Sequence, residues 1–158
     1  MAIEYDLEIA APLPAAPVAN ELLAVAETLG LFDTAVTAEL LVHEGARTRL
    51  GMWIMVLDVG RGQHDPVAED LGFSPTVDVG FRMDKFTDMS AQKDDMIRLV
   101  STMLDRVPGD AVLHFQYEQV WLLRQNGELT LSEDDDIWPP QRLAAVHQPY
   151  RRATHAFN

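Results

Sequence analysis

The chain has 158 residues, which fits one domain with a sizeable core, and 47% of them are hydrophobic, which argues against a disordered or fibrous protein. It carries 25 acidic and 12 basic side chains, a net charge of −13; this favours a basic partner over nucleic acid or an anionic membrane, unless it serves only solubility. The chain has no cysteine, no apolar run long enough to cross a membrane and an acidic start unlike a signal peptide, so we expect a cytoplasmic protein.

Alternating and helical patterns fill the first 60 residues. Residues 3–9 alternate, which predicts a strand with one buried face and one acidic, solvent-exposed face. A helix is predicted over 17–29 with Gly30 as its C-cap, followed by a short turn that Thr37 caps. The segment 46–59 predicts a strand, and Gly51 within it indicates a bulge or a bend.

The composition of residues 60–75 predicts a loop with one short turn near 67–71. Residues 76–123 then predict a strand, a helix that Ser90 caps and Pro108-Gly109 ends, and a second strand. Asn126-Gly127 predicts a hairpin, because both residues tolerate the left-handed conformation of a type I′ turn. A short helix that starts at Trp138-Pro139-Pro140 and runs through Val146, and a polar tail over 148–158, complete the chain.

These elements predict an α+β fold: a single mostly antiparallel sheet with two main helices packed on one face, in one domain over residues 1–158. Both halves of the chain run strand, helix, then one or two strands. This order indicates either a tandem strand–helix–strand–strand arrangement or a coincidence, since many short α+β domains share it.

The sequence contains no catalytic signature. It has no phosphate-binding glycine loop and no nucleophile elbow, and His43-Glu44 lacks the second histidine of a zinc protease. The segment from His64 to Asp70 could attract a metal, although a solvated loop explains it better. His114 is expected on the exposed sheet face. We therefore expect no enzyme, no cofactor and no metal site.

Acidic side chains instead suggest contacts with a cationic partner. Asp134, Asp135 and Asp136 stand beside Trp138, and charge next to an aromatic anchor is a common composition of a binding hot spot. Alternatively, Trp138 packs on the core and the aspartates only solvate a turn. A second candidate group lies on the exposed sheet face and comprises Glu4, Asp6, Glu8 and Asp78.

A different class of function is small-molecule binding. A tandem fold can form a cleft between its halves, and Trp53, Trp121 and Tyr117 could line such a cleft. The other interpretation is that these three aromatic side chains belong to the core.

Several segments, taken in order, resemble a known family: EYDLEIA, LFDTAVTAELL, LGFSPTVDVGFRMDKF, MIRLV, VPGDAVLHFQYE, VWLLRQNGEL and WPPQRLAAVHQPYRRATHAF. Over nearly its whole length the chain is similar to the third class of Sit immunity proteins, which belong to bacterial polymorphic-toxin (swarm-inhibition) systems. The resemblance implies a cytoplasmic protein that protects its own cell by binding and blocking a cognate toxin delivered by kin. It assigns no binding residues.

Overall fold

A computed structural model describes residues 2–60 and 65–158, and within them one eight-stranded sheet has the order β2-β3-β4-β1-β5-β6-β7-β8. The strands are β1 (Glu4–Ile9), β2 (Ala46–Arg47), β3 (Trp53–Asp58), β4 (Val77–Arg82), β5 (Ala111–Phe115), β6 (Gln119–Gln125), β7 (Glu128–Leu131) and β8 (Arg151–Arg152). The helices are α1 (Ala15–Leu29), α2 (Ala38–His43), α3 (Pro66–Leu71), α4 (Met89–Arg106) and α5 (Pro140–Leu143). All pairs in this sheet are antiparallel except β7 with β8, which confirms the predicted α+β class.

The two halves of the chain are interleaved in the sheet. The central strand β1 pairs with β4 on one side and β5 on the other, and β4 lies between β1 and β3. Strands from both halves therefore alternate in the order of a β-α-β-β-α-β unit, rather than forming two blocks with a cleft between them.

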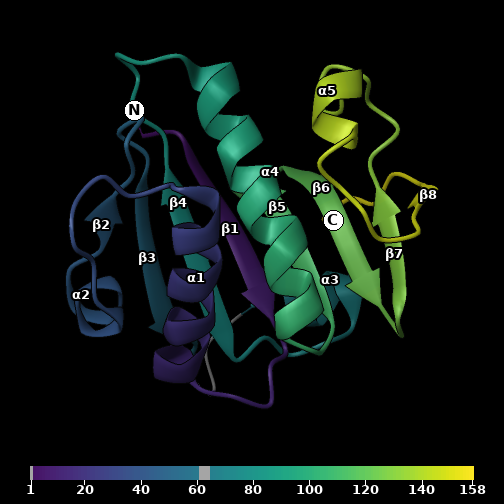
Figure 1. Ribbon diagram of the computed structural model, residues 1–158. Helices are drawn as coiled ribbons and strands as arrows, with labels where there is room; N and C mark the ends of the chain where they lie inside the picture. Colours follow the sequence, from purple (N-terminus) through teal and green to yellow (C-terminus); the bar gives the residue numbers. More distant parts are fainter. Residues whose placement is uncertain (1, 61–64) are drawn as a thin grey trace.

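Helices α1 and α4 lie side by side on one face of the sheet, here called the inner face (Figure 1). Both bury an apolar stripe at helical spacing, for example Val18, Leu22 and Val25 on α1. They cover Leu7 and the alternate residues of the neighbouring strands, so the main core lies between the helices and the sheet. None of the helices in the described part of the chain is both long and apolar enough to cross a bilayer.

The predicted strand over 46–59 is two strands around a tight turn. Gly51 adopts a φ of 93°, and a Cβ atom there would lie 2.4 Å from Oδ2 of Asp84. Only glycine combines this conformation with such a close neighbour. The bend predicted at Gly51 is therefore present, and it separates β2 from β3.

Other turn and cap predictions have mixed outcomes. Gly30 ends α1 in the left-handed conformation, and Asn126 and Gly127 have φ values of 54° and 79° at the β6–β7 hairpin, as predicted. The predicted N-cap of α4 is wrong: Asp88, not Ser90, accepts the hydrogen bond from the N–H of Ala91. Both residue types cap helices well, and the backbone geometry before the helix decides between them.

Candidate partner-binding surface

The face of the sheet opposite α1 and α4, called the outer face, is covered over only part of its width. Helix α3 and Phe157 from the tail pack on β5 and β6 in a small cluster built around Val67, Phe73, Val112, Val120 and Leu123. The outer side chains of β1, β3 and β4 lie outside that cluster. They include all four carboxylates of the second predicted group, which the register brings together on neighbouring strands.

Asp6 and Asp78 form a pair of carboxyl groups on β1 and β4. Burial, then a hydrogen bond to Asp6 and its negative charge, raises the pKa of Asp78 to about 9. Burial also raises the pKa of Asp6. Two partly buried carboxyl groups that share a hydrogen bond cannot both ionise easily, so one proton is retained near neutral pH.

Glu8 and His114 lie beside this pair and are fully enclosed. His114 is 0% exposed, and its Nε2 lies 2.7 Å from Oε2 of Glu8. Its Nδ1 accepts a hydrogen bond from the N–H of Tyr117 at 3.1 Å, so the proton is on Nε2, which donates to Glu8. The expectations that Glu8 and His114 are exposed on the sheet face are therefore wrong.

This burial results from a turn that the sequence pattern does not predict. Gln116 and Tyr117 have φ values of 51° and 58°, a conformation unusual for residues other than glycine and asparagine. The turn stacks the Tyr117 ring on His114, with ring centroids 4.3 Å apart, and Phe157 packs edge-on against both rings. Burial, then the negative charges of Glu8, Asp65 and Asp78, raises the pKa of Tyr117 well above its ordinary value.

An apolar surface adjoins the carboxyl pair. Trp53, Met55 and Leu57 point to the outer face of β3, beside Gly80 and Asp78 of β4. Because Gly80 has no side chain, a cavity of about 170 Å³ opens among these residues and Asp6. The sequence pattern of β3 does not predict this surface, because an unbroken apolar run does not show which of its side chains face solvent.

The acidic loop lies elsewhere, between β7 and α5. Asp134, Asp135 and Asp136 are exposed, and Asp135 lies 3.5 Å from Arg152. Strands β5 and β6 separate β7 from β1, so the structure does not combine this loop with the outer-face carboxylates.

The expectation that Trp138 is an exposed aromatic anchor is wrong. Trp138 is 1% exposed, its Nε1 donates to the carbonyl of Trp121 at 3.0 Å, and the two rings pack edge-on. Arg142 holds the same region, donating to the Ile137 carbonyl at 2.7 Å and to Asp94 on α4 at 2.8 Å. Trp138 therefore anchors the acidic loop to the core instead of facing a partner.

The three aromatic side chains of the small-molecule hypothesis do not line one cavity. Trp121 is buried on the inner face against Tyr5, whereas Trp53 and Tyr117 lie on the outer face at opposite sides of β1, Trp53 on β3 and Tyr117 in the turn between β5 and β6. The predicted cleft between two halves is likewise replaced by a continuous sheet. These observations argue against the small-molecule alternative in the form in which it was proposed.

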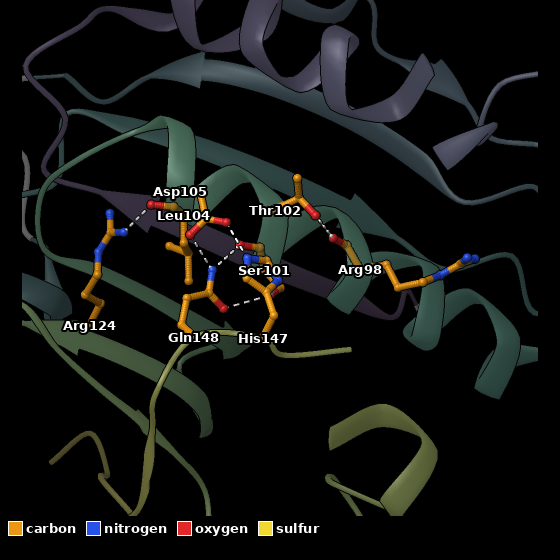
Figure 2. A network of polar contacts seen from close by, with 8 residues as sticks. All are labelled: Arg98, Ser101, Thr102, Leu104, Asp105, Arg124, His147 and Gln148. Carbon is orange, nitrogen blue, oxygen red and sulfur yellow. Dashed lines mark hydrogen bonds and ion pairs between the residues drawn. The ribbon is translucent and has the colours of Figure 1, made fainter. Parts of the chain in front are cut away.

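A serine, a histidine and an aspartate do meet at the end of α4, but as a structural network (Figure 2). Nε2 of His147 contacts Asp105, and Nδ1 lies 3.4 Å from Oγ of Ser101. Ser101 is 1% exposed, and its hydroxyl donates to Oε1 of Gln148 at 2.8 Å. A nucleophile must reach its substrate, and the buried Ser101 cannot. The network instead joins the segment before β8 to α4.

Candidate metal ligands receive no support from the geometry. Among residues 2–60 and 65–158, no three His, Cys, Asp or Glu side chains are placed to hold a metal ion. Asp65 caps α3 by accepting from the N–H of Val67 at 2.9 Å. His64 lies outside the described residues.

Comparison with protein families matches most of the chain. The SitI3-like family model matches residues 3–142, which run from β1 into α5 and include both acidic surfaces. No curated protein and no solved structure matches the chain. The family match agrees with the resemblance noted in the sequence. The chain belongs to the SitI3-like family.

Proposed function

We propose that this chain is an immunity protein that neutralises a cognate bacterial toxin by direct stoichiometric binding, without a reaction of its own. The observation that carries the proposal is the SitI3-like match over residues 3–142. The family suggests an immunity protein. That this chain binds and neutralises a toxin is our proposal. We infer that the protein acts in the cytoplasm, where it would meet a toxin delivered by kin.

The charge of the chain supports a basic partner. A net charge of −13 would attract a cationic surface over several ångströms before contact. If the toxin is a nuclease, its basic cleft would meet carboxylates in place of phosphates. The exposed aspartates 134–136 would then contribute to steering, and Asp6 and Asp78 would contribute to contact.

A stoichiometric inhibitor and an enzyme that destroys the toxin or its product make different predictions. We expect tagged protein to capture one basic partner from its own organism at low salt and to lose it at higher salt. The captured protein should arrest growth when produced in a sensitive bacterium, and co-production of this chain should restore growth. In a purified assay, inhibition should be complete only near one molar equivalent.

Two results would overturn the proposal. A captured protein that does not harm cells would show that the partner is not a toxin. Protection at far less than one equivalent would show turnover, and therefore an enzymatic activity instead of stoichiometric blockade.

A further inference from the structure

The uncovered part of the outer face carries an apolar surface with an acidic wall. This outer patch consists of Trp53, Met55, Leu57, Gly80, Asp6, Asp78 and Phe86. Leu57 is 46% exposed and Phe86 is 98% exposed, although both are large apolar side chains. Trp53 and Arg82 line both the 170 Å³ cavity over Gly80 and a neighbouring cavity of about 450 Å³ that Phe86 also lines, so the patch is continuous.

The exposure of Phe86 is imposed by its loop. The side chain of Gln92 binds the backbone of Asp84 twice, at 2.8 Å to the N–H and 2.8 Å to the carbonyl. Oδ1 of Asp84 accepts from the N–H of Phe86 at 2.9 Å, and Thr87 donates to the Leu50 carbonyl at 2.8 Å. A loop held at four points presents its aromatic ring to solvent before any partner arrives, which lowers the entropy cost of binding.

The polar edge of the patch is also ordered in advance. Nε and Nη2 of Arg82 donate to Oε1 of Glu4 at 2.8 Å and 2.6 Å, and the guanidinium lies 5.5 Å from the centroid of the Trp53 ring. At the other end, Oδ1 of Asp78 is buried and has no hydrogen-bond partner among the described residues. An arriving cation would satisfy that oxygen.

Charge and size select among the possible occupants. A second copy of this chain would bring two acidic walls together in a protein that already carries −13, which disfavours self-association. The cavity over Gly80 has a volume of about 170 Å³. It has room for one side chain, and its carboxyl wall favours a positive one.

We propose that the outer patch is the surface that contacts the toxin, and that it takes a segment with apolar side chains and a flanking arginine or lysine. The apolar side chains pack against Leu57, Met55 and Phe86, and the cation enters over Gly80 toward Asp6 and Asp78. This inference rests on the proposed function, because the partner is the toxin.

Three substitutions test the patch without disturbing the core. Phe86→Ala removes a fully exposed ring, and Leu57→Arg places a like charge in front of the expected cation. Gly80→Val fills the cavity, since the first atom of the new side chain would meet only ordinary contacts, 3.5 Å from Asp6 and 3.9 Å from Met55. Tyr150→Ala is the matched control, because Tyr150 is 38% exposed and precedes β8 at the far side of the sheet.

The probe is the partner purified from the capture experiment, and calorimetry measures its Kd for each variant. We expect each patch variant to weaken binding at least ~10-fold, while Tyr150→Ala stays within about threefold of wild type. Melting temperatures of the free variants should match wild type. Trp53 provides a direct readout, because Trp121 and Trp138 are 3% and 1% exposed. Binding should reduce the quenching of Trp53 fluorescence by acrylamide.

The outcomes separate this inference from the proposed function. Wild-type affinity in all three patch variants would overturn the outer patch while leaving toxin binding intact. Loss of binding on neutralising Asp134, Asp135 and Asp136 instead would assign contact to the acidic loop. A wild-type dimer that Leu57→Arg converts to a monomer would show that a second copy occupies the patch. Capture of no toxin by the wild-type protein would remove both proposals.

Discussion

At the scale of single residues, the outer face carries two largely buried carboxyl groups that retain a proton. Asp6 and Asp78 lie on adjacent strands, and their raised pKa values follow mainly from burial. A carboxyl group with a raised pKa holds its proton in the folded state above the pH at which the unfolded chain releases it. Its contribution to stability is therefore complete at low pH and decreases as pH rises.

Stability should fall as pH rises from about 4 to about 9, the interval between the ordinary pKa of an aspartate and that of Asp78. We expect a loss of at least ~1.4 kcal/mol in the free energy of unfolding, which corresponds to one pKa unit. Asp78→Asn should flatten the decline, because the amide has no proton to release. Urea unfolding at a series of pH values measures this. Asp135→Asn, with a 92% exposed side chain, is the control, and parallel profiles for wild type and Asp78→Asn would contradict the prediction.

The Glu8–His114 pair gives a second prediction at this scale. Glu8→Ala leaves the buried Nε2–H of His114 without its acceptor, and such an orphaned donor costs ~1–3 kcal/mol. Glu8→Gln keeps an oxygen acceptor in nearly the same place, so its loss should be clearly smaller. Denaturant unfolding of both variants at one pH compares them. Equal losses would show that shape, not the hydrogen bond, makes Glu8 important.

At the scale of elements, end residues and turns determine where the functional surfaces lie. Asp88 begins α4 and thereby ends the loop that carries Phe86. The Gln116–Tyr117 turn places a ring over His114, and Trp138 fixes the start of the segment that leads to α5. Each of these residues adopts a local backbone conformation that its residue type permits but does not require.

Removing the cap of α4 tests the corrected helix start. Asp88→Ala should lower the free energy of unfolding by ~1 kcal/mol, because the N–H of Ala91 loses its acceptor. Ser90→Ala removes only a 3.3 Å contact with Arg142 and should cost less. Thermal or urea unfolding of the two variants ranks them. A larger loss for Ser90→Ala would mean that Ser90 caps the helix in solution.

At the scale of the whole molecule, net charge governs how fast a basic partner is found. Replacing Asp134, Asp135 and Asp136 by asparagine lowers the negative charge by three on a loop that Trp138 holds in place. We expect association with the captured toxin to slow several-fold at low salt, with the dissociation rate nearly unchanged. Stopped-flow kinetics across a salt series measures both rates. An unchanged association rate at low salt would exclude the acidic loop from steering.

Much of the fold could be predicted from local patterns. The periodicity of residues 77–107 predicts a strand and a helix, Gly30 ends α1, and Asn126-Gly127 turns between β6 and β7. These features depend on neighbours within a few positions, where hydrophobic period and backbone preference act directly. The α+β class, the two helices on one face and the acidic surface follow from the same information.

Only the tertiary structure decided which polar residues face solvent. Glu8 and His114 alternate with core residues as exposed positions do, yet both are buried, and Tyr117 of the Gln116–Tyr117 turn and Phe157 pack on the His114 ring. Trp138 is drawn into the core by Trp121, seventeen positions earlier in the chain. The outer patch exists because strands far apart in sequence align Gly80 with Asp6 and Met55. Local periodicity assigns a residue to a face of a strand, but burial depends on what packs over that face, and distant segments supply that covering.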